Sequence, residues 1–225
     1  MFDPIAYNTK NAVNHKALIL LNWWPFVKDP KTSEGVAEIK GWQAANGLTA
    51  DGGLGPASWA ALRARYAPES WLRVLPRGYS AVRAVYGDLG EKIVGGKVIV
   101  SAAWKDKHLT YVTFKDGRRR LFVVELAREF ETLFDLAVEH SGYRPKSVQT
   151  WVPRYKRGPN SGSGLSAHCW CAVDFDPSLN PWGNSPKSPI VKYPLFAAFF
   201  RVAGWSCGTD WKTPDTMHLQ GAKGI

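Results

Sequence analysis

Two segments near the C-terminal end of the 225-residue chain carry histidines and carboxylates at spacings that suit metal chemistry. The first places His168 six residues before Asp174, and the second places Asp215 three residues before His218. Two histidines and one carboxylate make a hydrolytic zinc site whose fourth position is open to water. Zinc lowers the pKa of that water to roughly 7, and another carboxylate can take its proton during attack on a carbonyl. The four residues therefore predict a metal-dependent hydrolase.

Other side chains near the first histidine compete for the ligand role. Asp176 is an alternative to Asp174, although the register of the run Ala-Val-Asp-Phe-Asp-Pro favours Asp174. Cys169 and Cys171 suggest thiolate ligation, but a Cys-x-Cys pair without a second pair lacks the spacing of structural zinc sites. We therefore expect both cysteines to be small core residues.

The base role of Asp215 depends on the local backbone. Residues three apart in a strand face opposite sides, so Asp215 and His218 reach one metal only if a turn lies between them. Pro214 favours such an irregular backbone. The remaining histidines are interpreted as structural, because a lone histidine is more often a satisfied residue than a ligand; they are His15, His108 and His140.

The two segments resemble the zinc DD-peptidase family, which includes vancomycin-resistance dipeptidases, DD-carboxypeptidases and phage L-alanyl-D-glutamate endolysins. The family pattern is Ser-x-His-x-x-Gly-x-Ala-x-Asp, followed later by an acidic residue three positions before a final His. Ser166, His168 and the run Ala172-Val173-Asp174 match, and Asp215 stands where phage endolysins often have Asp. The loop between the first two ligands is one residue shorter than in the family, and Cys171 replaces the usual Gly.

This resemblance implies a catalytic domain of the hedgehog/DD-peptidase type, with an α+β fold. It also implies that Zn²⁺ is the cofactor, held by His168, Asp174 and His218. Asp215 would then be the general base, which passes its proton on to the leaving amine.

Arginines and further residues around the ligands are expected to handle the substrate. Arg144, in Ser-Gly-Tyr-Arg, looks like the family's arginine segment, and Arg154 shortly precedes the first ligand. A guanidinium suits both the carboxylates of a peptide substrate and the oxyanion formed during hydrolysis, so these two are assigned catalytic roles. Arg157, Ser166 and Trp170 are expected to contact the substrate, with loop fixing as the alternative for Ser166.

The elements that must position these residues are predicted from apolar spacing. Apolar residues from Leu126 to Ala137 recur at i, i+4, i+7, i+8 and i+11, which predicts a helix ending before Ser141-Gly142. Strands are expected at Lys97–Ala103 and Leu109–Phe114, a second helix at Tyr193–Ala203, and a strand or loop from Trp205 to Leu219. Strands and helices without repeating strand-helix units indicate an α+β architecture.

The first sixty-odd residues are predicted to form short helices, at Glu38–Ala45 and Ser58–Tyr66, joined by a turn over Gly47–Pro56. The apolar stretch Ala17–Val27 is too short to span a bilayer and is expected to be a packed helix, not a signal peptide. Ala67–Ser70 breaks the helical pattern. We therefore predict two domains, residues 1–68 and residues 69–225.

The N-terminal turn belongs to a wider pattern, Val36, Ile39, Gln43, Gly47-Leu48, Asp51-Gly52 and Gly55-Pro56. This pattern resembles the peptidoglycan-binding domain of cell-wall hydrolases, which is a small three-helix bundle. The glycines permit positive φ in a tight loop, and Asp51 can satisfy loop amides. The resemblance implies bacterial peptidoglycan as the partner. Any exposed indole among Trp23, Trp24 and Trp42 is a candidate to stack on sugars, although most tryptophans in so small a bundle are expected to form its core.

Composition narrows the classes of function. Hydrophobic residues make up 45% and charged residues 21%, which disfavours disorder and coiled coil, and the 11 tryptophans exceed what a core needs. A net charge of +10 favours an anionic partner, but the longest basic run, Arg118–Arg120, is too short to indicate nucleic acid. The three cysteines cannot pair completely, which favours synthesis in a reducing compartment.

Together these features predict a bacteriophage-type endolysin: a monomeric zinc metallopeptidase that hydrolyses an amide of the peptidoglycan stem, L-alanyl-D-glutamate first among the candidates. We expect synthesis in the host cytoplasm without a signal peptide, access to the wall after membrane permeabilisation, and neither stable membrane insertion nor nucleic-acid binding. The alternatives are a D-alanyl-D-alanine carboxypeptidase or cross-link endopeptidase, and a non-catalytic peptidoglycan-binding protein.

Overall fold

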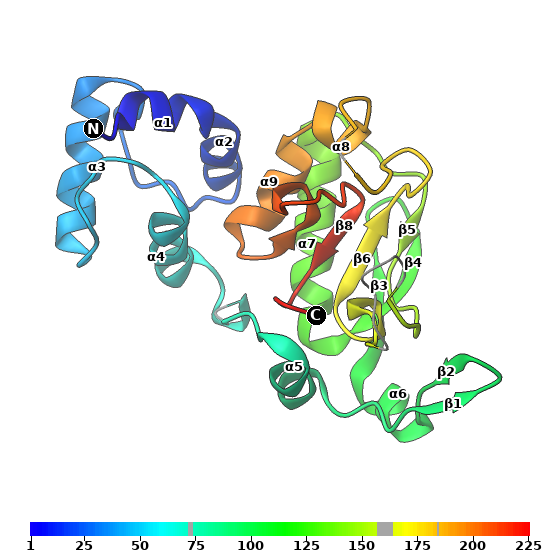
Figure 1. The fold of residues 1–225 in the computed structure, drawn as a ribbon. Coiled ribbons are helices and arrows are strands. Elements are labelled where there is room, and N and C mark those ends of the chain that lie inside the picture. The colour runs from blue at the N-terminus through cyan, green and yellow to red at the C-terminus, as the bar shows by residue number, and fades with distance from the viewer. Residues whose placement is uncertain (72–73, 157–163, 184) are drawn as a thin grey trace. The chain divides into compact units, whose positions relative to one another are not determined.

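The computed structural model describes residues 1–71, 74–156, 164–183 and 185–225, and its architecture is α+β, as predicted (Figure 1). The chain divides into two compact units. The N-terminal unit contains residues 1–73 and 197–204, and the C-terminal unit contains residues 74–196 and 205–225. Within the described parts of the chain, no helix has both the length and the apolar character needed to cross a membrane.

The N-terminal unit is helical. Its helices are α1 (Pro4–Lys10), α2 (Ala12–Leu20), α3 (Ser33–Ala45) and α4 (Pro56–Tyr66), followed by the 3-10 turn η1 (Glu69–Trp71). The described residues 1–71 thus form four α-helices, where a three-helix bundle is expected from the sequence. The stretch expected to be helical from Ala17 to Val27 is helical only up to Leu20, because Asn22 turns the chain with a φ of 62°. Fully buried side chains of this unit include Ala17, Leu18, Ile39, Leu54 and Leu62.

Two buried amides hold the turn between α3 and α4. Gln43 donates from Nε2 to Asp51 Oδ1 and to the carbonyl of Gly53, both at 3.0 Å, and accepts from the amide of Gly52 at 2.8 Å. Asn8 of α1 donates to the Gly52 carbonyl and accepts from the Leu54 amide, both at 2.9 Å. The Gln…Asp-Gly pattern therefore describes a loop tied to two helices by hydrogen bonds, not an unconstrained turn.

The C-terminal unit combines helices with short antiparallel sheets. Its first half contains α5 (Gly78–Tyr86), β1 (Lys92–Val94), β2 (Lys97–Ile99), α6 (Ala102–His108), β3 (Leu109–Thr113), β4 (Arg119–Val123) and α7 (Val124–Ser141). The second half contains β5 (Val148–Gln149), η2 (Ala167–Cys169), β6 (Ala172–Phe175), α8 (Pro189–Lys192), β7 (Ser206–Cys207), η3 (Gly208–Asp210) and β8 (His218–Gln220). Helix α9 (Leu195–Val202) starts in this unit, and its residues from Ala197 cluster with the other unit.

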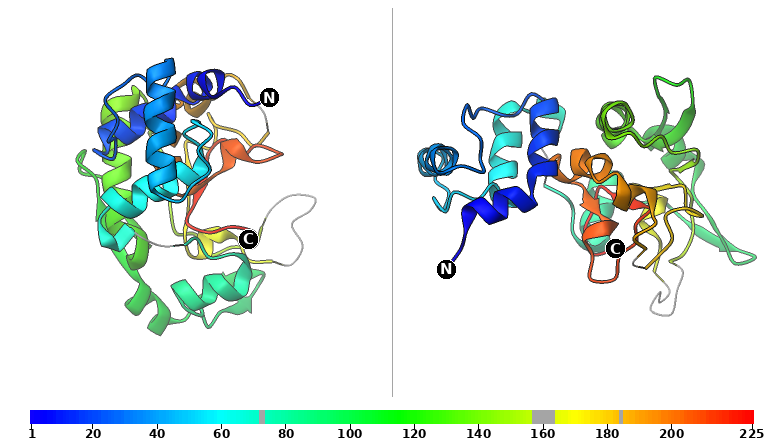
Figure 2. Two further views of the ribbon diagram at one scale, coloured as in Figure 1. Left: turned by 90° about the vertical axis from the view of Figure 1, so that its left-hand side faces the viewer. Right: turned by 90° about the horizontal axis from the view of Figure 1, so that it is seen from above.

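Helix α7 confirms the predicted amphipathic helix and forms the core of this unit. Its residues Leu126, Phe130, Leu133, Phe134 and Ala137 are all fully buried. The rings of Phe130 and Phe134 lie 6.4 and 5.8 Å from that of Phe175 on β6, so α7 packs against the sheet, as Figures 1 and 2 show. The helix ends where Gly142 adopts a left-handed conformation with a φ of 82°, which a residue with a side chain rarely adopts.

The largest sheet has the strand order β5-β6-β8-β7, and all neighbours are antiparallel. In the β6–β8 pair, Asp174 lies opposite His218 and Ala172 lies opposite Gln220. Residues directly opposite each other in an antiparallel pair project from the same face of the sheet. The register of these two central strands therefore joins the two segments that the sequence marks for metal chemistry.

Candidate metal centre

His168, Asp174 and His218 converge on one buried point. Their ligand atoms all lie within 4.8 Å of one another. Asp174 stands between the two rings, with Oδ2 3.0 Å from His168 Nε2 and Oδ1 2.9 Å from His218 Nδ1. Zinc bonds of about 2.0–2.2 Å in a tetrahedron hold two ligands roughly 3.4 Å apart, so these separations are close to those of a zinc site.

The first histidine is carried by the 3-10 turn η2. Ser166 caps this turn and accepts from the His168 amide at 3.4 Å. The His168 ring donates from Nδ1 to the carbonyl of Thr150 at 3.1 Å, which leaves Nε2 as the atom that faces Asp174. The loop to Asp174, although one residue short, closes through a bond from the Cys171 amide to the Ala167 carbonyl at 2.8 Å. The shortening therefore does not separate the two residues.

The second histidine faces the site with Nδ1, whereas the first faces it with Nε2. His218 donates from Nε2 to Oε1 of Gln220 at 2.8 Å, so Nδ1 faces Asp174. In a neutral imidazole only one nitrogen carries hydrogen, so both facing nitrogens present lone pairs to a carboxylate.

Electron-rich atoms so close together require a positive charge between them. Buried His168 Nε2 has no hydrogen-bond partner in the described part of the chain, despite its 3.0 Å approach to Asp174. A divalent cation bound by all three residues would satisfy this atom and the carboxylate at once. The donor set therefore fits zinc.

The electrostatics of the site follow from burial and proximity. Burial opposes the charge of Asp174, but the two imidazoles outweigh burial and hold the pKa of this carboxyl below its usual range. Burial likewise lowers the pKa of His218, while its contact with Asp174 outweighs that effect and leaves the pKa raised. The site thus keeps its carboxylate ionised and attracts positive charge, whether a proton or a metal ion.

Asp215 lies beside this group on the turn that its expected role requires. The His218 amide donates to the Asp215 carbonyl at 3.0 Å, and Asp215 itself donates from its amide to the Gly208 carbonyl at 3.0 Å. A Cβ at Gly208 would lie only 2.1 Å from the Asp215 carbonyl oxygen, so only glycine fits there. Asp215 Oδ1 is buried without a hydrogen-bond partner among the described residues, and burial raises the pKa of this carboxyl. An acid in this state suits proton transfer.

The predicted arginines differ in their distance from the three converging residues. Arg154 reaches the site, with Nη2 3.6 Å from Asp174 Oδ2. Arg144 is exposed, and its charge helps to lower the pKa of Asp116. Arg157 lies outside the described residues. Arg154 is therefore the guanidinium that the structure brings to the candidate centre.

Trp170 corrects a sequence expectation. Its ring is fully buried, donates from Nε1 to the Gly87 carbonyl at 3.1 Å, and packs under the Arg83 guanidinium at 5.6 Å. A ring enclosed in this way offers no surface to a substrate, so Trp170 is a core residue. Ser166 is also buried, and its contacts are those of the loop-fixing alternative.

The competing ligands have other partners. Asp176 accepts from the Tyr143 hydroxyl at 2.9 Å and from the amides of Lys146 and Ser147 at 3.1 and 2.6 Å. Cys169 and Cys171 are fully buried, and burial raises the pKa of the Cys169 thiol to about 11. A thiol in this state is a poor ligand, because metals bind thiolate. Both cysteines therefore lie in the core, as expected.

Sequence reasoning assigned no role at this site to Thr150, Gln220 or Trp211. Thr150 and Gln220 orient the two rings, and the Trp211 ring packs on His218 with centroids 5.3 Å apart. Gln220 could have been noted, because residues two apart in a strand share a face. The contact of Thr150 is made by its backbone, so no side-chain pattern reveals it.

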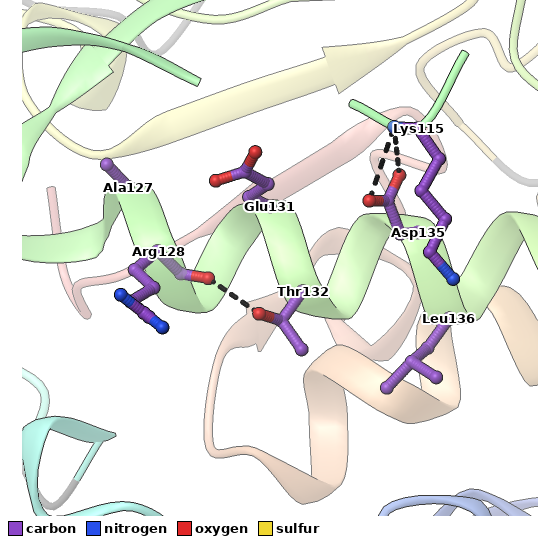
Figure 3. A pocket seen from close by; sticks show the side chains of 7 residues that line it. All are labelled: Lys115, Ala127, Arg128, Glu131, Thr132, Asp135 and Leu136. Carbon is purple, nitrogen blue, oxygen red and sulfur yellow. Dashed lines mark hydrogen bonds between the residues drawn. The ribbon is translucent and has the colours of Figure 1, made fainter. Parts of the chain in front are cut away.

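A cavity of about 620 Å³ lies away from the metal centre, on α7 (Figure 3). Charges of both signs line it, including Lys115, Arg128, Glu131 and Asp135. Within it, the Asp135 carboxylate accepts from the Lys115 amide at 3.1 and 3.3 Å. These contacts stabilise the fold, and none of the predicted site residues lines the cavity.

Comparison with protein families finds a match to a family described as D-alanyl-D-alanine carboxypeptidase, over residues 159–221. Comparisons with curated proteins and with solved structures find no match. The family match spans all three converging residues and Asp215, and it supports a D-Ala-D-Ala carboxypeptidase-like peptidase. Peptidases of this family are zinc-dependent, in agreement with the donor set.

Proposed function

We propose that this chain is a zinc-dependent endolysin that hydrolyses an amide of the peptidoglycan peptide stem, with L-alanyl-D-glutamate as the scissile bond. The observation that carries the proposal is the buried His168–Asp174–His218 group beside an acid that has no hydrogen-bond partner on Oδ1, Asp215. A structural metal site would be closed by four protein ligands. Three ligands plus a nearby acid suit hydrolysis.

His168, Asp174 and His218 would hold the zinc, which when bound supplies Lewis-acid activation of water and of the substrate carbonyl. Asp215 takes the proton from the attacking water as the oxygen bonds to the carbonyl carbon. The Arg154 guanidinium stabilises the negative charge that develops on the carbonyl oxygen. Asp215 then gives the proton to the amide nitrogen as the C–N bond breaks, which releases an amine and a carboxylic acid, and the acid gives its remaining proton to the amine or to water.

The N-terminal unit is proposed to bind the wall, on the strength of its anchored Gln…Asp-Gly loop. The proposed enzyme is a monomer made in the host cytoplasm, and it reaches peptidoglycan after membrane permeabilisation. The charge of +10 suits an anionic wall. In the basic run, Arg118 and Arg120 donate to backbone carbonyls of Pro145 and Val148, at 2.7 and 2.8 Å, which speaks against a nucleic-acid stripe.

A D-alanyl-D-alanine carboxypeptidase or cross-link endopeptidase is the second candidate, favoured by the description of the matching family. It uses the same ligands and the same base. The two candidates differ only in the amide that is cut.

Digestion of purified peptidoglycan by the zinc-loaded chain, followed by mass analysis of the fragments, separates these candidates. We expect fragments with a new amino terminus on D-glutamate. Release of D-alanine, or cleavage of cross-linked stem peptides into two separate stems, would instead identify a D-alanyl-D-alanine carboxypeptidase or cross-link endopeptidase. Sacculi left intact by a folded, zinc-loaded chain would overturn the peptidase proposal, with His168→Ala as the inactive control.

A further inference from the structure

We propose that Gln220 is a positioning residue for the metal: it fixes the His218 ring so that Nδ1, and not Nε2, is the ligand atom. This inference rests on the proposed zinc site. Gln220 touches neither the substrate nor the metal, and it acts only through His218.

The strand geometry places Gln220 where this role requires it. Residues two apart in a strand project from the same face, so β8 puts Gln220 on the face that carries His218. Across the sheet, Gln220 faces Ala172, just as His218 faces Asp174. The small side chain of Ala172 leaves room for the amide, which is 2% exposed.

The orientation of the amide is determined by its second partner. Gln220 donates from Nε2 to the carbonyl of Ala222 at 3.0 Å, and a carbonyl can only accept. A flipped amide would put two oxygens against each other at Ala222. Gln220 therefore presents Oε1 to His218, 2.8 Å from its Nε2.

An acceptor at this position decides where the hydrogen of the ring lies. His218 must carry hydrogen on Nε2 to bond with Gln220, so the lone pair of the neutral ring is on Nδ1, which points to Asp174 at 2.9 Å. A flip of the ring about its Cβ–Cγ bond would put the Cε1–H group, not the Nε2 hydrogen, against the amide oxygen, and the hydrogen bond to Gln220 would be lost. The single contact with Gln220 thus fixes both the orientation of the His218 ring and the nitrogen that carries its hydrogen.

The same arrangement recurs at the other histidine with a backbone group. His168 donates from Nδ1 to the Thr150 carbonyl, and Nε2 faces the site. No side-chain substitution removes that carbonyl. At His218, by contrast, the orienting acceptor is a side chain, which makes the effect measurable by substitution.

Gln220→Met removes the acceptor at nearly constant volume, while Gln220→Glu keeps an oxygen facing His218 and, as the protonated acid that burial favours, can still donate to the Ala222 carbonyl. Loss of such an orienting contact typically weakens metal affinity by about 10- to 100-fold. We expect that loss in the Met variant and affinity within about threefold of wild type in the Glu variant. Zinc affinity of the full chain is measured by competition with a chromophoric chelator.

Asn180→Leu is the matched control for a general loss of stability. Asn180 is another fully buried amide of the same unit, which donates to the Phe175 carbonyl at 2.8 Å and to the Tyr143 hydroxyl at 2.9 Å. Its substitution should lower the melting temperature of the metal-free chain and leave zinc affinity unchanged. Equal losses of affinity in the Asn180→Leu and Gln220→Met variants would overturn the proposal.

A second measurement uses the wild-type chain and does not depend on variants that fold. Nitrogen-15 NMR of the zinc-loaded chain should show His218 protonated on Nε2 and bound through Nδ1. His218 bound through Nε2, or a Gln220→Met variant with wild-type affinity, would overturn the role of Gln220 and leave the zinc site standing. A wild-type chain that binds no zinc would overturn both.

Discussion

Asp174 lies directly opposite His218 in the antiparallel pairing of β6 with β8, and their side chains meet at 2.9 Å although 44 residues separate them along the chain. The pairing is a non-local contact that the strand register alone establishes. A slip by one residue would turn one of the two side chains to the other face of the sheet. The geometry of the candidate metal centre therefore depends on the register of these two short strands.

Zinc content should depend on three residues and not on Asp176. His168→Ala, Asp174→Ala and His218→Ala should each lose stoichiometric zinc, because two ligands do not hold the ion against dialysis. Metal analysis of the purified variants is the measurement. Zinc retained by the His168→Ala and His218→Ala variants would show that the site is assigned wrongly.

Asp176→Ala should keep its zinc and lose stability. The substitution leaves the Tyr143 hydroxyl and the amides of Lys146 and Ser147 without their acceptor. An unsatisfied buried donor costs about 1–3 kcal/mol, so we expect a loss of at least about 2 kcal/mol in the free energy of unfolding. Urea denaturation measures it. A stable Asp176→Ala variant without zinc would instead make Asp176 a ligand.

Asp215→Asn should slow hydrolysis of peptidoglycan without weakening zinc binding or wall binding. The amide is nearly isosteric with the acid, so the fold, the zinc and wall binding should be unchanged. The rate of peptidoglycan hydrolysis should fall by about 10²- to 10⁴-fold, the usual contribution of a general base. Turbidity loss of purified sacculi measures the rate. Full activity of the zinc-loaded variant would remove Asp215 from the mechanism and direct attention to Asp210.

The N-terminal unit should lose stability at mildly acidic pH because of His15. Burial, aided by the charge of Lys31, lowers the pKa of His15 to about 4 from an ordinary 6.5. The unfolded chain therefore takes up this proton first, and stability falls as the pH falls from about 6.5 to 4. The full effect is about 3 kcal/mol, reached below pH 4.

Unfolding followed by tryptophan fluorescence at several pH values measures this effect, since the Trp24 ring lies 5.4 Å from His15. His15→Leu removes the titrating group and should flatten the dependence between pH 4 and 6.5. A variant with the same pH dependence as wild type would assign the effect to another group.

Wall binding should depend on the half-exposed indoles of the N-terminal unit. Trp24 and Trp42 flank the buried Phe26, with ring centroids 5.1 and 5.5 Å from it. Substituting both by Ala in the inactive Asp215→Asn chain should abolish retention on insoluble peptidoglycan at moderate salt, since aromatic faces stack on sugars. Tyr111→Ala, an exposed aromatic of β3, is the control. Retention that disappears only at high salt would indicate charge attraction alone.

The local parts of this fold could be predicted from sequence because their causes are local. The apolar face of α7 follows from the spacing of residues from Leu126 to Ala137, and its end follows from Gly142. The helix up to Val202 likewise ends before Gly204, which has a φ of 89°. The types and order of His168, Asp174, Asp215 and His218 also lie in the sequence, since zinc chemistry restricts which side chains can act.

Tertiary structure alone decided which of these side chains meet and which nearby residues serve them. Trp170 and Arg154 both lie near the first ligand in sequence, yet one is fully buried in the core and the other reaches Asp174. Gln220 and the Thr150 carbonyl orient the two rings through contacts that exist only once β5, β6 and β8 pair. Spacing along the chain carries no information on such contacts, because they depend on the register and burial of segments that are distant in sequence.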